Sequence, residues 1–379
     1  MEQMITVIGA GPIGLRAATG LKNEGWDVTV LEEHSEIGVP ENCSGLLSVN
    51  GLQKNKIDVS EVTVNKIFGA KIFSPEKTFL KIERKEPVAL VVERAGLDKK
   101  LEKKAEKKGI QIRKNTRMID VRKDTIFVQH EQRGEMMKTR FVVGADGAAS
   151  KTRKLVNPKI DPKAFVRTIQ VKAKGSFDDR LVEVHLGDFC KGFFAWVIPE
   201  NKTTARIGLG VSGSFNAREN FNKFTKEMEI EVLNESSFVI PVTRPIKEIQ
   251  KDNIFLVGDA AYQTKATTGG GIITGSIAAD IAVKTISDHL KHKKPLTDYW
   301  KNLSPLNKEL ELHWKVRKYF NSLNDKQINS LIRKFKKAGM EEFLEKHGDM
   351  DFPSKFINKM MLSPSKWGLL PTGLKVLFS

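Results

Sequence analysis

The stretch Met4–Gly14, MITVIGAGPIG, decides the fold of this 379-residue chain. Its apolar β run leads into Gly9, Gly11 and Gly14, which are spaced as G-x-G-x-x-G. A helical pattern follows, and residues 27–31, DVTVL, form a second apolar strand. A strand, a glycine turn, a helix and a second strand within about 30 residues predict a right-handed crossover in a parallel sheet.

The glycine turn predicts a nucleotide site. In this pattern the first glycine permits a tight turn, the second lets the backbone approach a pyrophosphate, and the third packs the helix on the strand. The helix N-terminus adds N–H donors and partial positive charge. Glu32 ends the second strand, where its carboxylate can accept hydrogen bonds from ribose hydroxyls and repels a 2′-phosphate. We therefore expect FAD or NAD rather than NADP, with a glycine turn beside a surface Glu as the structural alternative.

Two later segments favour FAD. Residues 142–147, VVGADG, and residues 254–259, IFLVGD, each place an Asp after a hydrophobic strand. We expect Asp259 to bind the ribityl hydroxyls. We expect the turn Gly269–Gly271 to bring N–H groups against the flavin pyrimidine edge, where they would stabilise a reduced, anionic flavin. An Asp in this position can also merely cap a helix.

With these three segments in this order, the chain resembles the glutathione-reductase-type FAD proteins, in the branch that includes p-hydroxybenzoate hydroxylase, squalene epoxidase and the geranylgeranyl reductases. The resemblance implies an α/β fold: an FAD-binding Rossmann-like domain, an inserted mixed β-sheet substrate domain and a helical C-terminal region. It implies that Arg94 opens a helix near the flavin ribityl chain and phosphates, with a helix-surface Arg as the alternative. It also implies backbone contacts to FAD from Ile13, Met118 and Ile272.

The hydrophobic pattern changes along the chain and marks the domains. From about residue 163 to residue 245 alternating strands dominate, and from residue 253 the parallel pattern returns. We therefore expect a discontinuous FAD-binding domain, an inserted domain for a prenyl substrate, and a helical, basic C-terminal region. Their predicted boundaries are residues 1–65, 86–160 and 250–297 for the first, 66–85 and 161–249 for the second, and 298–379 for the third.

Three segments are similar to the geranylgeranyl reductases in particular. Residues 38–48, GVPENCSGLLS, are close to that family's G-x-P-x-x-C-x-G-x-x-S, and residues 192–199, GFFAWVIP, resemble its aromatic-x-W-x-F-P. The third segment runs from Gly258 to Ile272. Ile198 and Tyr262 depart from the family, which usually has Phe and a small residue there. The resemblance, over about residues 1–300, implies an FAD-dependent reductase that saturates geranylgeranyl chains of membrane ether lipids, as archaeal digeranylgeranylglycerophospholipid reductases do.

Alkene reduction needs a hydride, which flavin N5 can supply, and a proton donor beside the alkene in a dry site. The resemblance implies that Cys43, in the loop after the strand of Glu32, lies near the isoalloxazine together with Ser44 and Gly45. It makes Cys43 the candidate catalytic residue, either as an acid or as a redox partner. The structural alternative is a small, buried, apolar cysteine.

An isoprenoid chain offers no charge to bind, so its site must be a long apolar tunnel with aromatic walls that ends at the flavin. Residues 192–199 offer such side chains. The candidates for the wall are Phe193, Phe194 (commonly Tyr in the family), Trp196, Val197, Ile198 and Pro199. Because side chains alternate along a strand, the alternative is that several of them only fill the core of the sheet.

The formal net charge is +17. The basic residues are spread along the chain without a nucleic-acid motif, so we expect no nucleic-acid partner. Charge alone fits either solubility or attraction to anionic lipid headgroups, worth about 1 kcal/mol per Lys or Arg near the surface. Basic helical patterns occupy residues 314–320 and 331–337, and residues 353–379 hold four lysines and no acidic residue. Apolar residues of this last stretch include Trp367, Leu369, Leu370, Leu377 and Phe378. The stretch is typical of a segment on an anionic membrane, with a core-capping tail or an oligomer contact as alternatives.

The chain begins without a basic n-region and cleavage site, and it holds no run of about 18 apolar residues. Cys43 and Cys190 are too few for a disulfide framework and too far apart for a metal or iron–sulfur site, although a single disulfide stays open. We therefore expect a cytoplasmic protein that associates peripherally with the inner face of the cell membrane.

The sequence does not identify the electron donor, and we expect an external one, either a ferredoxin or NADPH that docks without a motif. Two other functions stay open. A flavin-dependent monooxygenase or halogenase of the same fold is one, because F-x-W-x-I-P is similar to the W-x-W-x-I-P of halogenases. A non-catalytic prenyl-binding carrier is the other, although a carrier has no need of the complete set Gly9, Gly11, Gly14, Glu32 and Asp259.

Overall fold

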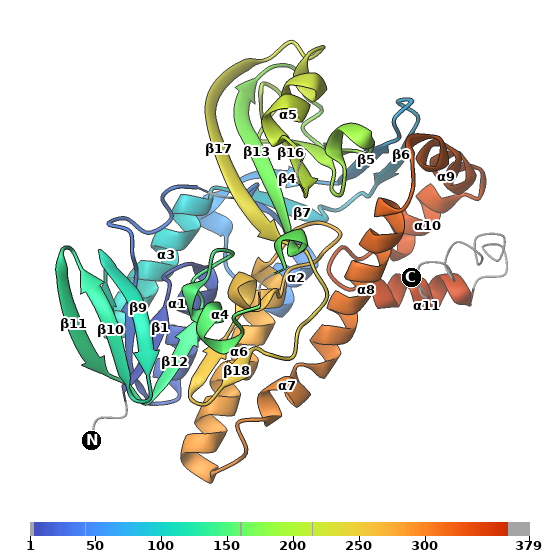
Figure 1. Ribbon diagram of the computed structural model, residues 1–379. Helices are drawn as coiled ribbons and strands as arrows, with labels where there is room; N and C mark the ends of the chain where they lie inside the picture. Colours follow the sequence, from blue (N-terminus) through green and yellow to red (C-terminus); the bar gives the residue numbers. More distant parts are fainter. Residues whose placement is uncertain (1–3, 42, 160, 214, 363–379) are drawn as a thin grey trace.

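The parallel sheet predicted from the N-terminal stretch is present in the computed structural model, which describes residues 4–41, 43–159, 161–213 and 215–362. Its strands are β1 (Met4–Ile8), β2 (Asp27–Leu31), β8 (Gln111–Arg113), β12 (Phe141–Gly144), β18 (Gln250–Lys251) and β19 (Ile254–Leu256). They are ordered β18-β19-β12-β1-β2-β8, and every neighbouring pair is parallel except β18 and β19 (Figure 1). The predicted α/β fold is therefore confirmed.

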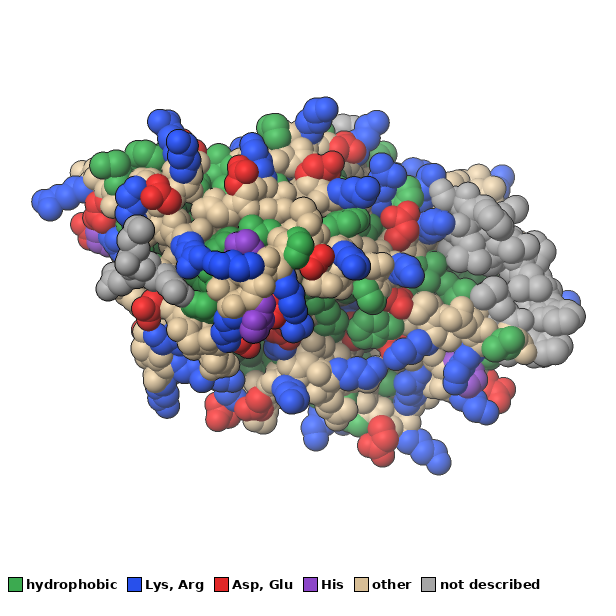
Figure 2. All heavy atoms as spheres, turned by 90° about the horizontal axis from the view of Figure 1, so that it is seen from below, with side chains coloured by type: hydrophobic (Ala, Val, Ile, Leu, Met, Phe, Trp, Pro, Cys, Tyr) green, Lys and Arg blue, Asp and Glu red, His purple; other side chains and the backbone are tan. Residues whose placement is uncertain are grey.

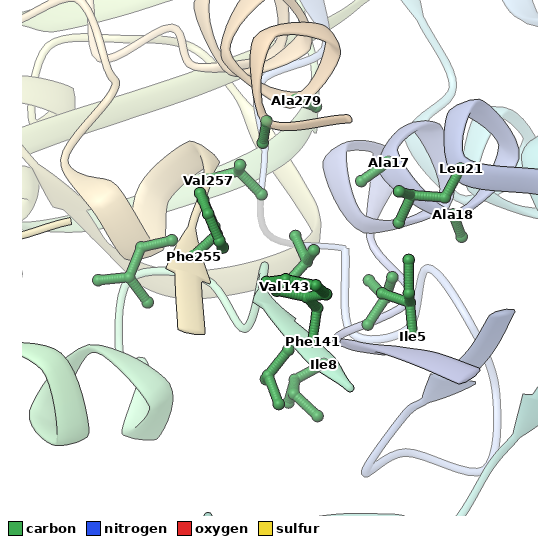
Figure 3. Close-up of a cluster of buried hydrophobic side chains, with 14 of the residues drawn as sticks. Ile5, Ile8, Ala17, Ala18, Leu21, Phe141, Val143, Phe255, Val257 and Ala279 are labelled. Carbon is green, nitrogen blue, oxygen red and sulfur yellow. The ribbon is translucent and has the colours of Figure 1, made fainter. Parts of the chain in front are cut away.

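Three long helices pack beside this sheet and bury its central strands. They are α1 (Pro12–Asn23), α3 (Arg94–Lys107) and α6 (Ile272–His292). Nearly every residue of β1, β12 and β19 is buried, as expected of parallel strands that are covered on both faces. Figure 3 shows Ala18 and Leu21 of α1, Ala279 of α6, and the strand residues Val143 and Phe255 in one buried cluster. This cluster is the core that fixes the helices against the parallel sheet, and so positions the edge at which β1, β12 and β19 end.

A small antiparallel sheet shares this core. It consists of β9 (Thr116–Arg122), β10 (Thr125–His130) and β11 (Arg133–Lys138). Met118, Ile126 and Val128 are buried in the same cluster as the residues of β1 and β12. Because the side chain of Met118 fills the core, its backbone is the part that a ligand could contact.

A seven-stranded mixed sheet occupies the upper part of Figure 1. Its strands are β5 (Gly69–Phe73), β6 (Phe79–Glu83), β13 (Phe165–Lys174), β14 (Leu181–His185), β15 (Ala195–Pro199), β16 (Thr204–Ser212) and β17 (Glu231–Pro241). The order is β17-β13-β16-β15-β14-β5-β6, and only β14 and β5 pair in parallel. Helix α5 (Ala217–Thr225) packs on one face through Phe221. The expected mixed sheet is present, and the exact domain boundaries stay a prediction.

A third sheet joins the two halves of the molecule. It consists of β3 (Leu46–Ser48), β4 (Thr63–Ile67) and β7 (Ala89–Val92), in the order β3-β7-β4. Val91 packs in a cluster with Trp196 of the seven-stranded sheet, whereas the next residue, Val92, packs with Ile273 of α6. The remaining short elements are α2 (Val49–Lys54), α4 (Lys151–Val156), η1 (Ser60–Val62), η2 (Pro162–Ala164), η3 (Asp188–Cys190) and η4 (Gly258–Ala261).

The predicted helical C-terminal region is also present. Its helices are α7 (Asp298–Asn302), α8 (Ser304–Asn321), α9 (Asp325–Lys337), α10 (Met340–His347) and α11 (Pro353–Met361). Ile328 and Ile332 of α9 pack against Leu80 of β6. The apolar face of this basic helix therefore caps the seven-stranded sheet.

The apolar residues predicted to lie on a membrane fall outside the described residues. These are Trp367, Leu369, Leu370, Leu377 and Phe378. Within residues 4–362, apart from positions 42, 160 and 214, no helix combines the length and the apolar composition needed to cross a bilayer.

Candidate active site

The three glycines of the first turn have different surroundings. Gly9 has φ +97°, and a Cβ there would lie 2.5 Å from the Ala145 carbonyl oxygen. A Cβ on Gly14 would lie 1.9 Å from the Gly9 carbonyl oxygen. A Cβ on Gly11, in contrast, would meet no described atom within 4 Å. The outer glycines are therefore required for packing, whereas Gly11 faces the open space that a pyrophosphate would need.

The N-terminus of α1 is arranged for an anion. Within the described residues no side chain caps it, and its first turn contains no acidic residue. Pro12 lacks an N–H, so the next donors along the helix are the N–H groups of Ile13 and Gly14. Free N–H groups and the positive end of the helix dipole together favour a bound phosphate.

Glu32 lies at the end of β2 and is 9% exposed. One carboxylate oxygen accepts a hydrogen bond from the Ala10 backbone N–H (2.8 Å), and the other accepts one from the His34 backbone N–H (2.9 Å). These bonds fix the carboxylate beside the glycine turn. A carboxylate accepts about four hydrogen bonds, so acceptor capacity remains for ribose hydroxyls.

The two Asp-containing turns have opposite roles. Asp146, after β12, accepts hydrogen bonds from the Ser150 hydroxyl (2.5 Å) and the Thr152 backbone N–H (2.9 Å), which places it at the start of α4. The helix-capping alternative therefore holds for Asp146. Asp259, after β19, has no hydrogen-bond donor to its carboxylate among the described residues. Burial raises its pKa to about 6, although Arg94 and Arg153 attract it and oppose the rise.

Arg94 is buried at the start of α3 rather than exposed, which makes the helix-surface alternative wrong. Its side chain is 13% exposed and binds both carboxylate oxygens of Asp98 at 3.2 Å. Its Nε has no hydrogen-bond partner among the described residues. Burial alone would lower the pKa of Arg94, but the neighbouring Cys43 and Asp98 outweigh it and raise the pKa. Arg94 thus links Cys43 and Asp259 electrostatically.

The loop of Cys43 is fixed against the seven-stranded sheet. The Cys43 carbonyl accepts a hydrogen bond from Gln170 Nε2 (3.3 Å), and Gln170 Oε1 accepts one from Trp196 Nε1 (3.1 Å). The Ser44 carbonyl accepts a hydrogen bond from Arg206 Nη1 (3.1 Å). Cys43 itself is partly exposed and is a free thiol. The backbone of the cysteine loop is therefore held against the sheet that carries Trp196.

Gly45 shows how closely this loop approaches both neighbours. Its φ is +71°, and a Cβ would lie 2.3 Å from the Val92 carbonyl oxygen and 2.5 Å from Arg206 Nη1. The Gly45 N–H lies 3.4 Å from Cys43 Sγ. Only glycine fits this contact, which explains the glycine two positions after the cysteine.

Three of the six predicted wall residues form one aromatic cluster, which we define as Phe193, Phe194 and Trp196. The rings of Phe193 and Phe194 stack at 4.2 Å, and Trp196 meets both edge-on at 6.5 and 5.8 Å. Ile198 is buried in the same hydrophobic group. The cluster lies on the face of the sheet away from α5.

Val197 and Pro199 lie on the opposite face. Val197 packs in the hydrophobic group that contains Phe221 of α5. Val197 and Pro199 line an open cavity of about 540 Å³ on that side. This is the side-chain alternation of a strand, and it separates Val197 and Pro199 from the other four predicted wall residues. Whether the aromatic cluster lines a tunnel stays a prediction.

The aromatic cluster rests on two glycines of β16. Cβ atoms on Gly208 and Gly210 would lie 2.2 Å from the Trp196 ring and 2.5 Å from the Phe193 ring. Residues 208–213, GLGVSG, also match G-x-G-x-x-G, but they fall at the end of an antiparallel strand that no helix follows directly. This second glycine pattern therefore provides a flat surface for aromatic rings rather than a nucleotide site.

The turn Gly269–Gly271 lies beside Asp259. A Cβ on Gly271, the N-cap of α6, would lie 2.6 Å from Asp259 Oδ1. Ile13 of α1 packs against Gly258 and Gly275, since Cβ atoms there would lie 3.2 and 3.0 Å from it. The first helical turns of α1 and α6 are thus brought to one place, with Ile272 at the start of α6. The individual contacts predicted for FAD stay predictions.

Several residues of this region gave no signal in the sequence. Gln170, Arg206 and Asp351 belong to strands or loops without a motif, and the buried Asp351 pairs with Lys265, which lies in the segment Gly258–Ile272 but had no predicted role there. Their partners lie far along the chain, so only the folded arrangement reveals them.

We expect substitutions at Gly11 and Gly14 to separate cofactor binding from folding. Gly11→Ala should leave the unfolding free energy of the apoprotein within about 0.5 kcal/mol of wild type, because its Cβ meets open space. It should weaken FAD binding at least tenfold, about 1.4 kcal/mol, because the methyl group occupies the phosphate space. Gly14→Ala should prevent folding. Urea unfolding and a fluorescence titration with FAD measure the two effects, and unchanged FAD affinity in Gly11→Ala would contradict the assignment.

We expect Asp259→Asn to stabilise the apoprotein in a pH-dependent way. The ordinary Asp pKa is 3.8 and burial raises that of Asp259 to about 6, so the ionised carboxylate destabilises the folded chain. This cost is absent below about pH 4, grows up to about pH 6 and is complete above it. Because Asp259 is partly exposed, we expect a gain of only about 1–2 kcal/mol at pH 8 and none at pH 4. Urea unfolding at both pH values tests this, and an equal gain at both would exclude titration as the cause.

Comparisons with known proteins agree with this geometry. A family model described as an FAD binding domain matches residues 2–295. An uncharacterised protein of Methanocaldococcus jannaschii is 31% identical over 95% of each chain. Digeranylgeranylglycerophospholipid reductase 1 of Methanothermobacter thermautotrophicus is 28% identical, over 90% of this chain and 92% of its own.

Solved structures share the fold at lower identity. A geranylgeranyl bacteriochlorophyll reductase-like protein from Thermoplasma acidophilum has a TM-score of 0.81 and 19% identity, over 88% of this chain and 91% of its own. The flavin-dependent brominase Bmp2 has a TM-score of 0.71 and 15% identity, over 95% and 98%. The chain therefore belongs to the FAD-binding domain family, and it is an FAD-dependent oxidoreductase.

Proposed function

We propose that the chain reduces carbon–carbon double bonds in the geranylgeranyl chains of membrane ether lipids. The observation that carries this proposal is the hydrogen-bonded chain from Trp196 through Gln170 to Cys43. It holds the backbone of Cys43, a free cysteine, beside Trp196, and together with the interaction between Cys43 and Arg94 it supports a role for this thiol between an apolar surface and the residues suited to FAD. An uncharged prenyl chain needs an apolar surface for binding, and an alkene needs a proton donor within reach.

The residues that would hold FAD follow from the geometry. The N–H groups at the start of α1 and the open space at Gly11 suit the pyrophosphate, Glu32 suits a ribose, and Asp259 suits the ribityl hydroxyls. In the turn Gly269–Gly271 the Gly269 N–H already donates to the Lys265 carbonyl (2.7 Å), so the Gly271 N–H, at the N-cap of α6, would be the one offered to the ring system. When bound and reduced by the external donor, the flavin would supply the hydride that one alkene carbon receives.

The proton for the other alkene carbon comes, in this proposal, from the Cys43 thiol. The S–H bond breaks, a C–H bond forms, and a thiolate remains on Cys43. The Arg94 guanidinium interacts with Cys43 and would stabilise that thiolate. The buried rings of Phe193 and Trp196 would limit the access of water to this step, and the thiolate would later regain a proton from solvent, to which Cys43 is partly exposed.

The electrons come from outside the chain in this proposal, from a ferredoxin or from NADPH. The glycine pattern at residues 208–213 lies in a strand and offers no second nucleotide site. Anaerobic mixing with each donor, followed by loss of the oxidised flavin absorbance, distinguishes the two.

We expect Cys43→Ala to retain FAD and to lower lipid reduction by about 10²–10⁴-fold, the usual loss when a positioned acid is removed. Cys190→Ala is the matched control, because Cys190 is buried on the α5 face of the seven-stranded sheet. The assay incubates dithionite-reduced holoprotein with digeranylgeranyl phospholipid without oxygen and follows the lipid mass. Wild type should add two hydrogen atoms per double bond.

Each other outcome identifies a different failure. A yellow protein that leaves the lipid mass unchanged but consumes oxygen with NADPH would favour a monooxygenase or halogenase. Full activity in Cys43→Ala would keep the reductase and remove Cys43 as the proton donor. A protein that binds prenyl lipid without FAD, the carrier alternative, would contradict the oxidoreductase assignment itself.

We further propose that the basic surface holds the protein at the anionic inner face of the cell membrane, where the substrate lies. Figure 2 shows Lys and Arg side chains spread over the face seen from below, rather than gathered in a single stripe. On α9, Lys334 and Lys337 are exposed, whereas the apolar side packs on the protein. Attraction over a broad surface would supply the affinity.

We expect the purified protein to sediment with vesicles that contain phosphatidylglycerol and to remain in solution with pure phosphatidylcholine. Raising the salt from about 0.05 M to about 0.5 M should release it, because exposed charges are screened over a shorter distance. Equal binding to both vesicles at high salt would contradict an electrostatic contact and favour apolar insertion.

A further inference from the structure

A single carboxylate of the C-terminal region connects two segments of the candidate FAD site. Asp351 follows α10 and is 0% exposed. Its Oδ1 accepts a hydrogen bond from Lys265 Nζ at 2.6 Å, and its Oδ2 accepts a short hydrogen bond from the Ser48 hydroxyl. Lys265 is itself only 5% exposed. Both oxygens of the carboxylate are thus occupied by partners from distant parts of the chain.

Ser48 belongs to the cysteine loop segment. It is the last residue of β3 and the N-cap of α2, where its hydroxyl oxygen accepts the Gly51 backbone N–H (3.0 Å). A Cβ on Gly51 would lie 2.6 Å from Asp351 Oδ2, so the carboxylate fits directly against the backbone. Asp351 therefore fixes the end of the segment that carries Cys43.

Lys265 organises the glycine turn before α6. Its carbonyl accepts the Gly269 backbone N–H (2.7 Å), and its own N–H donates to the Gly270 carbonyl (3.0 Å). A Cβ on Gly270 would lie 3.2 Å from Lys265 Nζ. The ammonium group thus lies immediately behind the turn, and Asp351 holds it there.

Helix α8 reinforces the same turn. His313 lies between Thr267, whose hydroxyl is 2.6 Å from Nδ1, and the Asp351 carbonyl, 3.1 Å from Nε2. Arg317 Nη1 donates to the Ala266 carbonyl (3.1 Å). The C-terminal region thus contacts the turn at residues 265, 266 and 267.

We infer that Asp351 is a positioning residue for FAD, and that FAD binding is coupled to the docking of the C-terminal region. This inference rests on the proposed contact between FAD and the turn Gly269–Gly271. A buried ion pair contributes little net stability compared with apolar side chains of similar size. Its effect here is on geometry, because it holds the cysteine loop and the glycine turn at a fixed separation. It also places a compensated positive charge beside the turn.

The coupling has a reciprocal consequence. If the docked C-terminal region strengthens FAD binding, bound FAD must strengthen the docking by the same factor. FAD should therefore protect residues 338–362 from proteolysis in wild type.

The experiment compares two single variants and one double variant of the full-length protein. Asp351→Asn removes the carboxylate that positions Lys265 and Ser48, so it should weaken FAD binding at least tenfold. It also leaves the Lys265 charge uncompensated, which should raise the flavin midpoint potential because positive charge favours a reduced, anionic flavin. Lys265→Met removes that charge and should lower the potential. A purely structural role for the pair would not shift the potential in opposite directions. FAD titration, a spectroscopic redox titration and limited proteolysis with and without FAD give the readouts.

Two controls keep the inference open to refutation. Lys265→Met combined with Asp351→Leu should restore folding if a single variant fails to fold, and it should still lose the protection by FAD. Lys77→Met removes an exposed ion pair with Glu227 and should change none of the readouts.

Wild-type FAD affinity and potential in Asp351→Asn, or no protection of residues 338–362 by FAD in wild type, would overturn the inference. Gly271→Ala tests the proposed contact separately, because its Cβ would crowd the turn and Asp259. Unchanged FAD affinity in that variant would refute the contact itself. None of these readouts depends on lipid reduction, so a wrong substrate would not affect them.

Discussion

The close contact of Gly14 with the Gly9 carbonyl is the constraint on which the arrangement of the site depends. Without a Cβ at Gly14, α1 can start directly above the end of β1, and Ile13 can pack between Gly258 and Gly275. The parallel strands β1, β12 and β19 all end at this edge, as ligand-binding edges of open α/β sheets do. The close approach of Gly14 to the Gly9 carbonyl therefore lets the glycine turn after β1 lie beside the segment after β19 and the start of α6.

The sequence was sufficient for the features that depend on local pattern. The β-turn-α-β unit, the mixed sheet and the C-terminal helices could be predicted because hydrophobic period and turn residues act over short distances. The pairs Lys265–Asp351 and Gln170–Trp196 could not be predicted, because their partners are far apart in the sequence and come into contact only in the folded chain. Pro199 is different: the alternation of β15 already places it opposite Trp196, and that period was available in the sequence.

Identical patterns have different roles because their surroundings differ. Asp146 and Asp259 both follow buried strands, yet Asp146 accepts hydrogen bonds at the start of α4, while no described residue donates a hydrogen bond to the Asp259 carboxylate. Likewise, the glycine pattern after β1 opens a helix, whereas the pattern at residues 208–213 makes room for Trp196 and Phe193. A motif thus restricts the backbone conformation, and the element that follows it determines whether it can bind a ligand or serves packing.

The charged groups around the site are of two kinds: some have hydrogen-bond partners within the protein, and others have none among the described residues. Asp351 has both oxygens bound, and Glu32 is fixed by two backbone N–H groups, so the folded chain itself supplies hydrogen-bond partners to both carboxylates. Asp259, the Nε of Arg94 and the start of α1 lack such partners among the described residues. Unsatisfied groups cost stability, and proteins keep them mainly where function requires them. One molecule that combines phosphates with a row of hydroxyls can supply partners to both the cationic and the anionic members of this set, and FAD is such a molecule.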